Sequence, residues 1–281
     1  MDTVYKYCGS HGVAVLRNSE LKITPPNQFN DPFEFTPRMI CSDTSRYAKR
    51  LFKTKANIKK LYEMKREDGG LAGSFHEFRK FMSDRRPLLF GMMKEAMQHT
   101  LPDSEKRLLD RVSELHGVLC MSSQRDSILM WGHYCDKLLG LVIGFDGTSE
   151  VFRQGKGLKP VAYLSQRVIF DALWVNGSRE MAKFEDQIVF SKSAEWSYEK
   201  ELRQFFRLSS LIRKPLDDGS VGHFLKFPPI SVVSVTLSPR CSPEQEKEVR
   251  TILQRPDYTH VKLDRAVLNE TSFELGFELL L

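Results

Sequence analysis

A long segment patterned as helix, set between two parts patterned as strand, constrains the fold more than any other feature of this chain. From about residue 43 to 117, apolar residues such as Tyr47, Leu51 and Ile58 recur near helical spacing, and no strand-like alternation appears. Strand-like runs precede and follow this segment. We therefore predict an α+β fold, a single domain over residues 1–281, in which a mixed, largely antiparallel central sheet carries a helical insertion at about 43–117.

Before the insertion, the chain is predicted to run strand, helix, strand. Residues 4–7 and 20–24 have the composition of strands, and Ser10 is a candidate cap for a helix that continues to about Asn18. Within the insertion, Pro102 and the two residues after it are expected to start the last helix.

After the insertion, the sheet is expected to resume. Helices are predicted through residues 128–134, over most of 168–190, and from Ser242 onward. At Ser242 the serine caps the helix, Pro243 occupies the first turn and Gln245 completes a capping box. Strands are predicted at residues 118–121, 141–145, 160–163, 201–206, 223–227 and 232–237.

Composition indicates a folded protein of a reducing compartment. Hydrophobic residues make up 41% of the chain and charged residues 28%, which is typical of globular proteins and not of disordered chains. No stretch approaches the roughly 18 apolar residues of a membrane helix, and the N-terminus lacks a basic region followed by an apolar one. The five cysteines are odd in number and have no metal-ligand spacing. We therefore expect a soluble cytoplasmic protein with no structural zinc and no membrane association.

The sequence FNDPF at residues 29–33 predicts a rigid loop. Proline fixes the chain there, and the Asn and Asp side chains can bond to neighbouring backbone amides. Either this is only a tight turn, or Asn30 or Asp31 orients a ligand.

The sequence WGHY at residues 131–134 lies on the predicted helix through 128–134. Trp131 is a candidate for the core, since aromatic residues dominate buried area, and otherwise for a ligand wall together with Tyr134. His133 is either a partly exposed imidazole without a role or a residue that binds a ligand or transfers a proton.

The sequence WSYEKELR at residues 196–203 brings carboxylates together. A period of two would place Glu199, Glu201 and Arg203 on one face of a strand. A carboxylate pair beside an arginine can keep one acid ionised for a substrate hydroxyl while the other is tuned for proton transfer. The alternative is a solvated ladder of surface charges.

A basic run is the fourth feature with functional potential. Residues 46–66 contain nine Lys or Arg residues and one acid, Glu63. Phosphate contact through Lys53, Lys59 and Lys60 would give salt-dependent binding of nucleic acid without sequence preference. A solvated helix face explains the same pattern.

These motifs together resemble a bacterial family of domains of unknown function. Its pattern is YKY, FNDPF, W-x-x-Y followed by Gly, and W-x-Y-E-x-E-x-R, found here at residues 5–7, 29–33, 131–134 with Gly140, and 196–203. A strand, helix, strand opening and a Glu that begins a late strand are also similar in order to ADP-ribosyltransferase-like proteins. That second resemblance implies a split sheet and NAD as substrate, without a metal.

The resemblance to ADP-ribosyltransferase-like proteins implies roles for individual residues. Glu201 would hold the nicotinamide-ribose hydroxyls and polarise the departing bond, Glu199 would be the upstream Glu, and Tyr5 or Tyr7 the N-terminal contact. The chain departs from that group in having no Arg or His in the first strand and no Ser-Thr-Ser run. The further residues expected to contact NAD are Asn30, Asp31, Trp131, His133, Tyr134 and Arg203.

Three classes of function follow. The first is an NAD-using transferase or NAD glycohydrolase, whose acceptor would be a protein, a nucleic acid or water. Such an enzyme would act as a bacterial toxin or as an anti-phage defence effector. The second is a non-catalytic nucleic-acid-binding or interaction module that uses the basic residues 46–66. The third is metal-dependent phosphodiester cleavage by Asp31, Glu199 and Glu201. The first class requires Asn30, Glu201 and either Trp131 or His133 in one cleft.

Overall fold

Two compact units make up the chain in the computed structural model, which describes residues 3–53, 55–68, 73–174 and 177–281. The first, here called the sheet unit, comprises Met1–Phe35, Asp110–Gln166 and Val189–Leu281. The second, the helical unit, comprises Thr36–Leu109 and Arg167–Ile188. Segments distant in sequence therefore build each unit.

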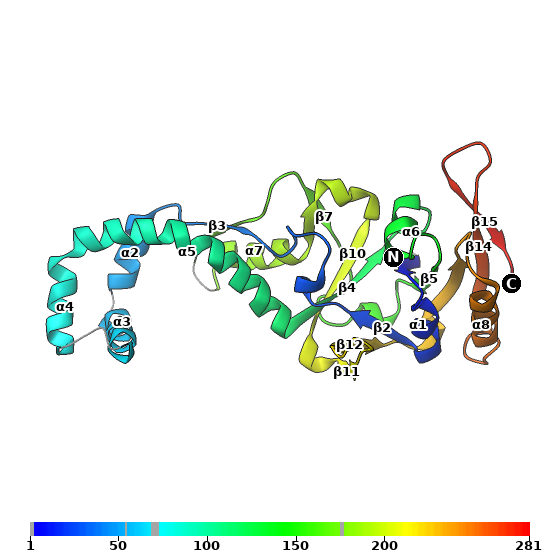
Figure 1. Ribbon diagram of the computed structural model, residues 1–281, viewed down its shortest axis with the longest axis horizontal. Coiled ribbons are helices and arrows are strands. Elements are labelled where there is room, and N and C mark those ends of the chain that lie inside the picture. Colours follow the sequence, from blue (N-terminus) through cyan, green and yellow to red (C-terminus); the bar gives the residue numbers. More distant parts are fainter. Residues whose placement is uncertain (1–2, 54, 69–72, 175–176) are drawn as a thin grey trace. The chain divides into compact units, whose positions relative to one another are not determined.

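An eight-stranded sheet organises the sheet unit, in the order β15-β14-β13-β5-β1-β4-β10-β6 (Figure 1). Among the described residues, β13 and β14 pair in parallel, and the other neighbours pair antiparallel. This confirms the predicted α+β class with a mixed, largely antiparallel sheet. The strands are β1 (Thr3–Cys8), β4 (His116–Ser122), β5 (Leu141–Asp146), β6 (Lys159–Pro160), β10 (Glu201–Arg207), β13 (Val232–Leu237), β14 (Lys262–Leu268) and β15 (Leu275–Leu279).

Smaller elements complete the sheet unit. A second sheet has the order β11-β12-β2, and β7 pairs in parallel with β9. These strands are β2 (Glu20–Ile23), β7 (Ala162–Leu164), β9 (Ser191–Ser193), β11 (Ile212–Pro215) and β12 (Val221–Lys226). The α-helices are α1 (Gly12–Asn18), α6 (Ile128–Tyr134) and α8 (Pro243–Leu253), and the 3-10 helices are η1 (Pro26–Gln28), η2 (Glu150–Phe152), η3 (Ala194–Glu199), η4 (Leu208–Ser210) and η5 (Pro229–Ser231).

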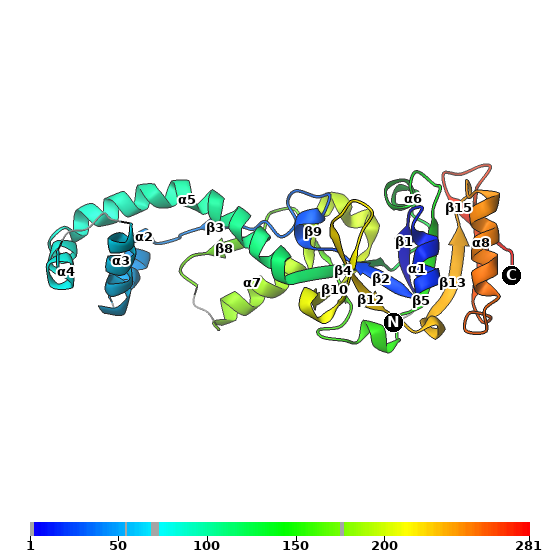
Figure 2. The same cartoon turned by 60° about the horizontal axis from the view of Figure 1, so that its bottom comes forward.

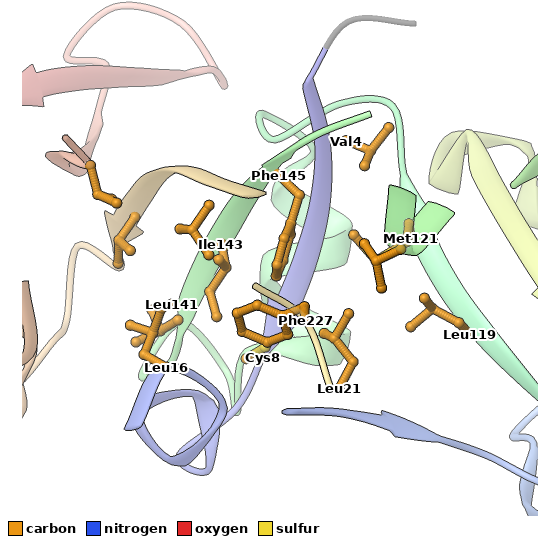
Figure 3. Close-up of a cluster of buried hydrophobic side chains, with 14 of the residues drawn as sticks. Val4, Cys8, Leu16, Leu21, Leu119, Met121, Leu141, Ile143, Phe145 and Phe227 are labelled. Atoms are coloured by element: carbon orange, nitrogen blue, oxygen red, sulfur yellow. The ribbon is translucent and has the colours of Figure 1, made fainter. Parts of the chain in front are cut away.

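One face of the large sheet carries the main hydrophobic core. Alternate residues of a strand point to the same side, so Val4 and Cys8 of β1 lie with Ile143 and Phe145 of β5 (Figure 3). Leu16 of α1 joins this buried cluster. Helices α1 and α8 lie side by side (Figures 1 and 2), joined by an ion pair between Arg17 and Glu248. This face is therefore closed by apolar packing.

The opposite face of the sheet carries a smaller aromatic cluster. Tyr7 points to this side and meets Trp131 of α6 in a T-shaped contact with ring centroids 5.8 Å apart. The Trp131 indole N–H donates to the carbonyl oxygen of Arg125 at 2.8 Å. Helix α6 therefore packs against β1 on this face.

Helix α8 begins at the predicted Ser242 cap, but the predicted capping box is not completed, because Gln245 Oε1 accepts from the Cys241 thiol at 3.2 Å. The Ser242 side chain accepts the backbone N–H of Gln245 at 3.2 Å, Pro243 occupies the first turn, and Val249 and Ile252 are buried. The predicted cap of α1 is wrong. The residue that precedes the helix is His11, which makes no side-chain cap bond, and the backbone N–H of Ser10 donates to the Asp136 carboxylate at 2.5 Å.

The helical unit contains α2 (Thr44–Lys53), α3 (Lys55–Glu67), α4 (Phe75–Asp84), most of α5 (Arg86–Leu115) and most of α7 (Arg179–Val189) (Figure 2). A capping box between Ser74 and Glu77 starts α4. Strands β3 (Arg38–Ile40) and β8 (Ile169–Asp171) pair in parallel. Arg167 donates to the carbonyl oxygen of Thr36 and pairs with Glu105 at 2.8 Å.

Two sequence predictions are wrong in this unit. A helix was expected to start at Pro102, but α5 continues through it, and the Ser104 hydroxyl donates back to the Thr100 carbonyl instead of capping a new helix. The region 168–190 was expected to be mainly helical, but its first part is β8, which gains backbone partners in β3. Among the described residues, no helix combines the length and apolar character needed to cross a bilayer.

Candidate active site

Glu199 and Glu201 lie on different elements. Strand β10 begins at Glu201, whereas Glu199 ends η3, and Lys200 between them has a left-handed backbone with φ of 42°. The prediction that all three residues share one face of a strand is therefore wrong for Glu199 and confirmed for Glu201 and Arg203. The Ser122 hydroxyl of the neighbouring strand fixes this bend by donating to the Glu199 carbonyl oxygen at 2.7 Å.

Arg203 forms a buried two-point ion pair with Glu201. Arg203 Nε lies 2.9 Å from Glu201 Oε1, and Arg203 Nη2 lies 2.8 Å from Glu201 Oε2. Nη2 also donates to Glu34 Oε1 at 2.7 Å, and Nη1 donates to the Val189 carbonyl oxygen at 3.0 Å. The planar guanidinium suits such a fork and holds Glu201 in one orientation.

Lys192 of β9 links three carboxylates. Its Nζ lies 2.7 Å from Glu199 Oε2, 3.0 Å from Glu34 Oε1 and 3.8 Å from Glu201 Oε2. We call Glu34, Glu199, Glu201, Lys192 and Arg203 the acidic cluster, because three negative groups face two positive ones. All five side chains are buried.

Burial and neighbouring charge act against each other on the acids of this cluster. Burial raises the pKa of Glu34, although Arg203 and Lys192 oppose the change. Burial also acts to raise the pKa of Glu201, but the charge and hydrogen bonds of Arg203, with Lys192, hold that pKa below its ordinary value. Desolvation acts to lower the pKa of Lys192, and the three carboxylates overcome it and raise that pKa. Lys192 is therefore a fixed positive charge and not a nucleophile.

A pocket of about 370 Å³ opens onto the carboxylates of the acidic cluster. Its charged lining comprises Glu34, Glu199, Glu201, Lys6 and Lys192, and Asn30 also lines it. Its aromatic lining comprises Tyr5, Tyr7, Phe29, His133 and Tyr134. Ligand pockets of this size commonly combine apolar walls with a few convergent polar groups.

Tyr134 connects the aromatic lining to the carboxylates. Its hydroxyl donates to Glu199 Oε1 at 2.6 Å, and burial, followed by the charge of Glu199, raises the pKa of Tyr134. The tyrosine therefore stays protonated and remains a hydrogen-bond donor. Glu199 is held on one oxygen by Tyr134 and on the other by Lys192.

Further aromatic rings surround His133, which is exposed. Its imidazole stacks on Tyr198 with ring centroids 6.2 Å apart, and the Trp196 ring lies 6.3 Å away. Lys192 Nζ lies 4.6 Å from the centroid of Trp196. The motif at residues 196–203 thus supplies both rings and charges to one region.

The structure brings most of the predicted site residues into this pocket. It is lined by Tyr5, Tyr7, Asn30, His133, Tyr134, Glu199 and Glu201. Three predicted NAD contacts lie outside the lining that the described residues form, namely Asp31, Trp131 and Arg203.

Each of these three residues makes contacts within the fold. Asp31 Oδ1 accepts the backbone N–H of Phe33 at 2.9 Å, so Asp31 shapes the turn. Trp131 is fully buried in the aromatic cluster. Arg203 is fully buried and supports Glu201 without reaching the pocket.

Sequence reasoning gave no role to Glu34 or Lys192. Glu34 directly follows the FNDPF loop, and its side chain turns toward Arg203 and Lys192. A Glu next to a candidate ligand loop was the available signal for Glu34. Lys192 carries no signal of its own, since a single lysine before a Trp-containing motif is common on protein surfaces.

The three residues of the metal-dependent alternative do not line one pocket in the described part of the chain. Asp31 is engaged in its own turn and does not line the pocket with Glu199 and Glu201. Across residues 3–53, 55–68, 73–174 and 177–281, no group of three or more His, Cys, Asp or Glu side chains is arranged to hold a metal ion.

The basic segment lies in the helical unit, on α2 and α3. Lys59 and Lys60 are exposed, and Lys59 lies 3.6 Å from Glu63 in an exposed ion pair. The Lys53 side chain lies outside the described part of the chain. Arg50, by contrast, donates to the carbonyl oxygens of Ala172 and Leu173, so part of the basic run serves packing within the unit.

Comparison of this chain with family models, with curated proteins and with solved structures finds no match. The function must therefore be argued from the site itself.

Proposed function

We propose that this pocket binds NAD and that the protein breaks the bond between nicotinamide and ribose. The ADP-ribose would pass to a protein, a nucleic acid or water in the bacterial cytoplasm, as expected of a toxin or an anti-phage defence effector. The observation that carries the proposal is the meeting of Glu199 and Glu201 with five aromatic rings in one pocket. The resemblance to ADP-ribosyltransferase-like proteins supports the same choice.

The residues present fit this substrate. Each carboxylate oxygen has two lone pairs, so Glu201 can accept bonds from ribose hydroxyls while both oxygens stay bonded to Arg203. The tyrosine rings of β1 offer flat apolar surface to a nicotinamide ring.

The chemistry requires stabilisation of positive charge. When the bond between carbon and nitrogen breaks, its electron pair leaves with nicotinamide and positive charge develops on the ribose. Buried carboxylates fixed before the reaction stabilise that charge without reorganising. Arg203 and Lys192 hold Glu201 and Glu199 in place, so they act as positioning residues.

The decisive test follows nicotinamide release from NAD by chromatography. Wild-type protein is expected to release nicotinamide above the uncatalysed rate. Glu201→Gln is expected to lower that rate at least about a hundredfold, because the loss of one group that stabilises charge in the transition state typically costs this much. Glu195→Gln on η3 is the matched control, because Glu195 is exposed and does not line the pocket. A circular dichroism spectrum shows that each variant is folded at the assay temperature. If wild-type protein neither binds NAD nor releases nicotinamide, the proposal is wrong.

A second candidate function is nucleic-acid binding by the helical unit. It is favoured by the exposed side chains of Lys59, Lys60, Lys65 and Arg66 on α3. This function does not exclude the first, since a bound nucleic acid could also be the acceptor.

A further inference from the structure

Asn30 lines the pocket from a loop that other residues hold in place. The Asp31 carboxylate accepts the backbone N–H of Phe33 at 2.9 Å, and the Asp31 carbonyl oxygen accepts the backbone N–H of Glu34 at 3.2 Å. The Glu34 carboxylate is bonded in turn to the buried Arg203 at 2.7 Å. Because the loop is fixed before a ligand arrives, little conformational entropy is lost when Asn30 contacts that ligand.

A chain of hydrogen bonds sets the orientation of the Asn30 amide. Lys192 and the Tyr134 hydroxyl donate to the two carboxylate oxygens of Glu199, at 2.7 Å and 2.6 Å. Burial raises the pKa of Tyr134, and a hydrogen bond from the Asn30 side chain acts in the opposite direction. The single hydroxyl hydrogen of Tyr134 is directed at Glu199, so Asn30 donates to the hydroxyl oxygen from its amide nitrogen. The amide oxygen of Asn30 is then left to accept a hydrogen bond from a ligand.

An amide oxygen in this position discriminates between ligand groups by their hydrogens. It accepts a hydrogen bond from an N–H or an O–H, and it gains nothing from a group that offers only lone pairs. In the same pocket, Tyr5, Tyr7 and Tyr134 supply flat surface for a ring. A planar ring that carries a primary carboxamide offers both the face and the N–H, so the lining suits such a ring.

We propose that Asn30 determines the specificity of the pocket by accepting a hydrogen bond from the carboxamide N–H of a nicotinamide ring. Rings of the same shape that cannot donate at this position are then disfavoured. The inference rests on the proposed function for the choice of ring. The carboxamide does not change when the bond between nicotinamide and ribose breaks, so the contact orients the ring both in the substrate and in the departing product.

The test compares nicotinamide with 3-acetylpyridine, in which a methyl ketone replaces the carboxamide. The two rings have nearly the same shape and are both neutral at pH 7.5, so charge does not separate them, but the ketone has no N–H. Ligand-observed NMR titration measures the two dissociation constants. Wild-type protein is expected to bind nicotinamide about fivefold more tightly, the usual effect of one net hydrogen bond.

Two variants assign this preference to Asn30. Asn30→Leu keeps the approximate size of the side chain and removes its hydrogen-bonding groups, so the ratio of the two dissociation constants should fall toward one. Asn27→Leu is the matched control. Asn27 is exposed on η1 and lies outside the lining that the described residues form, so this variant should keep the wild-type ratio.

Three results overturn the proposal: equal affinity of wild-type protein for the two rings, no binding of nicotinamide at millimolar concentration, or the wild-type ratio in folded Asn30→Leu. A circular dichroism spectrum establishes that each variant is folded before it is titrated. If Asn30→Leu does not fold, Asn30→Ala removes the same hydrogen-bonding groups and takes its place.

Failure of this inference is distinguishable from failure of the proposed function. A protein that prefers nicotinamide through Asn30 but does not cleave NAD retains the inference and loses the proposed function. A protein that cleaves NAD but binds both rings equally loses the inference alone.

Discussion

Glu34 accepts a 2.7 Å hydrogen bond from Arg203, a residue 169 positions further along the chain. This contact ties the loop that carries Asn30 to strand β10, which carries Glu201. Because the loop and the strand are distant in sequence, the pocket forms only when the tertiary structure is complete. Variants of the acidic cluster should therefore affect stability as well as ligand binding.

The first prediction concerns the stability of two Glu→Gln variants. Glu201→Gln leaves the buried guanidinium of Arg203 without its two-point partner, so we expect a loss of about 3 kcal/mol in the free energy of unfolding, the cost of breaking a buried ion pair. Glu34→Gln should cost less than half of this, because burial disfavours the ionised form of Glu34 and both cations keep other partners. Urea denaturation at pH 7 measures both values. Equal losses in the two variants would contradict this ranking.

The second prediction concerns pH. The pKa of Glu34 is raised in the folded protein, so its protonated form is favoured there and adds stability at pH values below the unfolded pKa. That contribution is lost as pH rises through the folded pKa. Glu34→Gln does not titrate, so its stability relative to wild type should increase as pH rises from about 4 to 7. A series of urea denaturations across this range tests the sign, with Glu195→Gln as the control that should follow wild type.

A third prediction concerns the hydroxyl of Tyr134, which donates to Glu199 Oε1 at 2.6 Å. Tyr134→Phe keeps the ring but removes the hydrogen bond that holds this oxygen of Glu199, so the rate of nicotinamide release should fall about tenfold. The free energy of unfolding should fall by about 1 kcal/mol, the usual net value of one hydrogen bond. Tyr62→Phe in the helical unit removes another tyrosine hydroxyl bond, to the Gly73 carbonyl oxygen, and should leave the rate unchanged. An unaltered rate in folded Tyr134→Phe would remove Tyr134 from the mechanism.

The sequence was sufficient to predict the helices and strands whose signals lie in neighbouring residues. The capped start of α8 depends on residues next to one another, and β5 is a short continuous apolar run, as a strand buried on both faces of the sheet requires. The class of fold and the mixed, largely antiparallel sheet could be predicted for this reason. The path of α5 through Pro102 could not be predicted, because a proline usually breaks a helix and this helix continues through it.

The site was partly predictable for a similar reason. Glu201, Tyr7 and Asn30 belong to motifs whose residues are unusual in combination, and all three line the pocket. Glu34 and Lys192 become functional candidates only through each other, at 3.0 Å across 158 residues of chain. A single sequence does not show such a pairing, and it also does not show that Lys200 adopts the left-handed backbone that removes Glu199 from the strand.

The last prediction concerns the basic face of the helical unit, where Lys59 and Lys60 are exposed on α3. If this face contacts nucleic acid, replacing Lys53, Lys59 and Lys60 with Gln should weaken binding to a similar degree for unrelated sequences and flatten its dependence on salt, since fewer counterions are released. Folding should survive, because exposed lysines contribute little to stability.

Filter-binding titrations at several salt concentrations compare this triple variant with wild type. Lys247→Gln on α8, in the other unit, is the control for loss of a single positive charge, and it should bind as wild type does. Three lost phosphate contacts should reduce the slope of log affinity against log salt by about 3, close to one per contact. An unchanged slope, or no binding by wild type at low salt, would mean that the basic residues form a solvated helix face, and the pocket beside the acidic cluster would then be the candidate that remains for function.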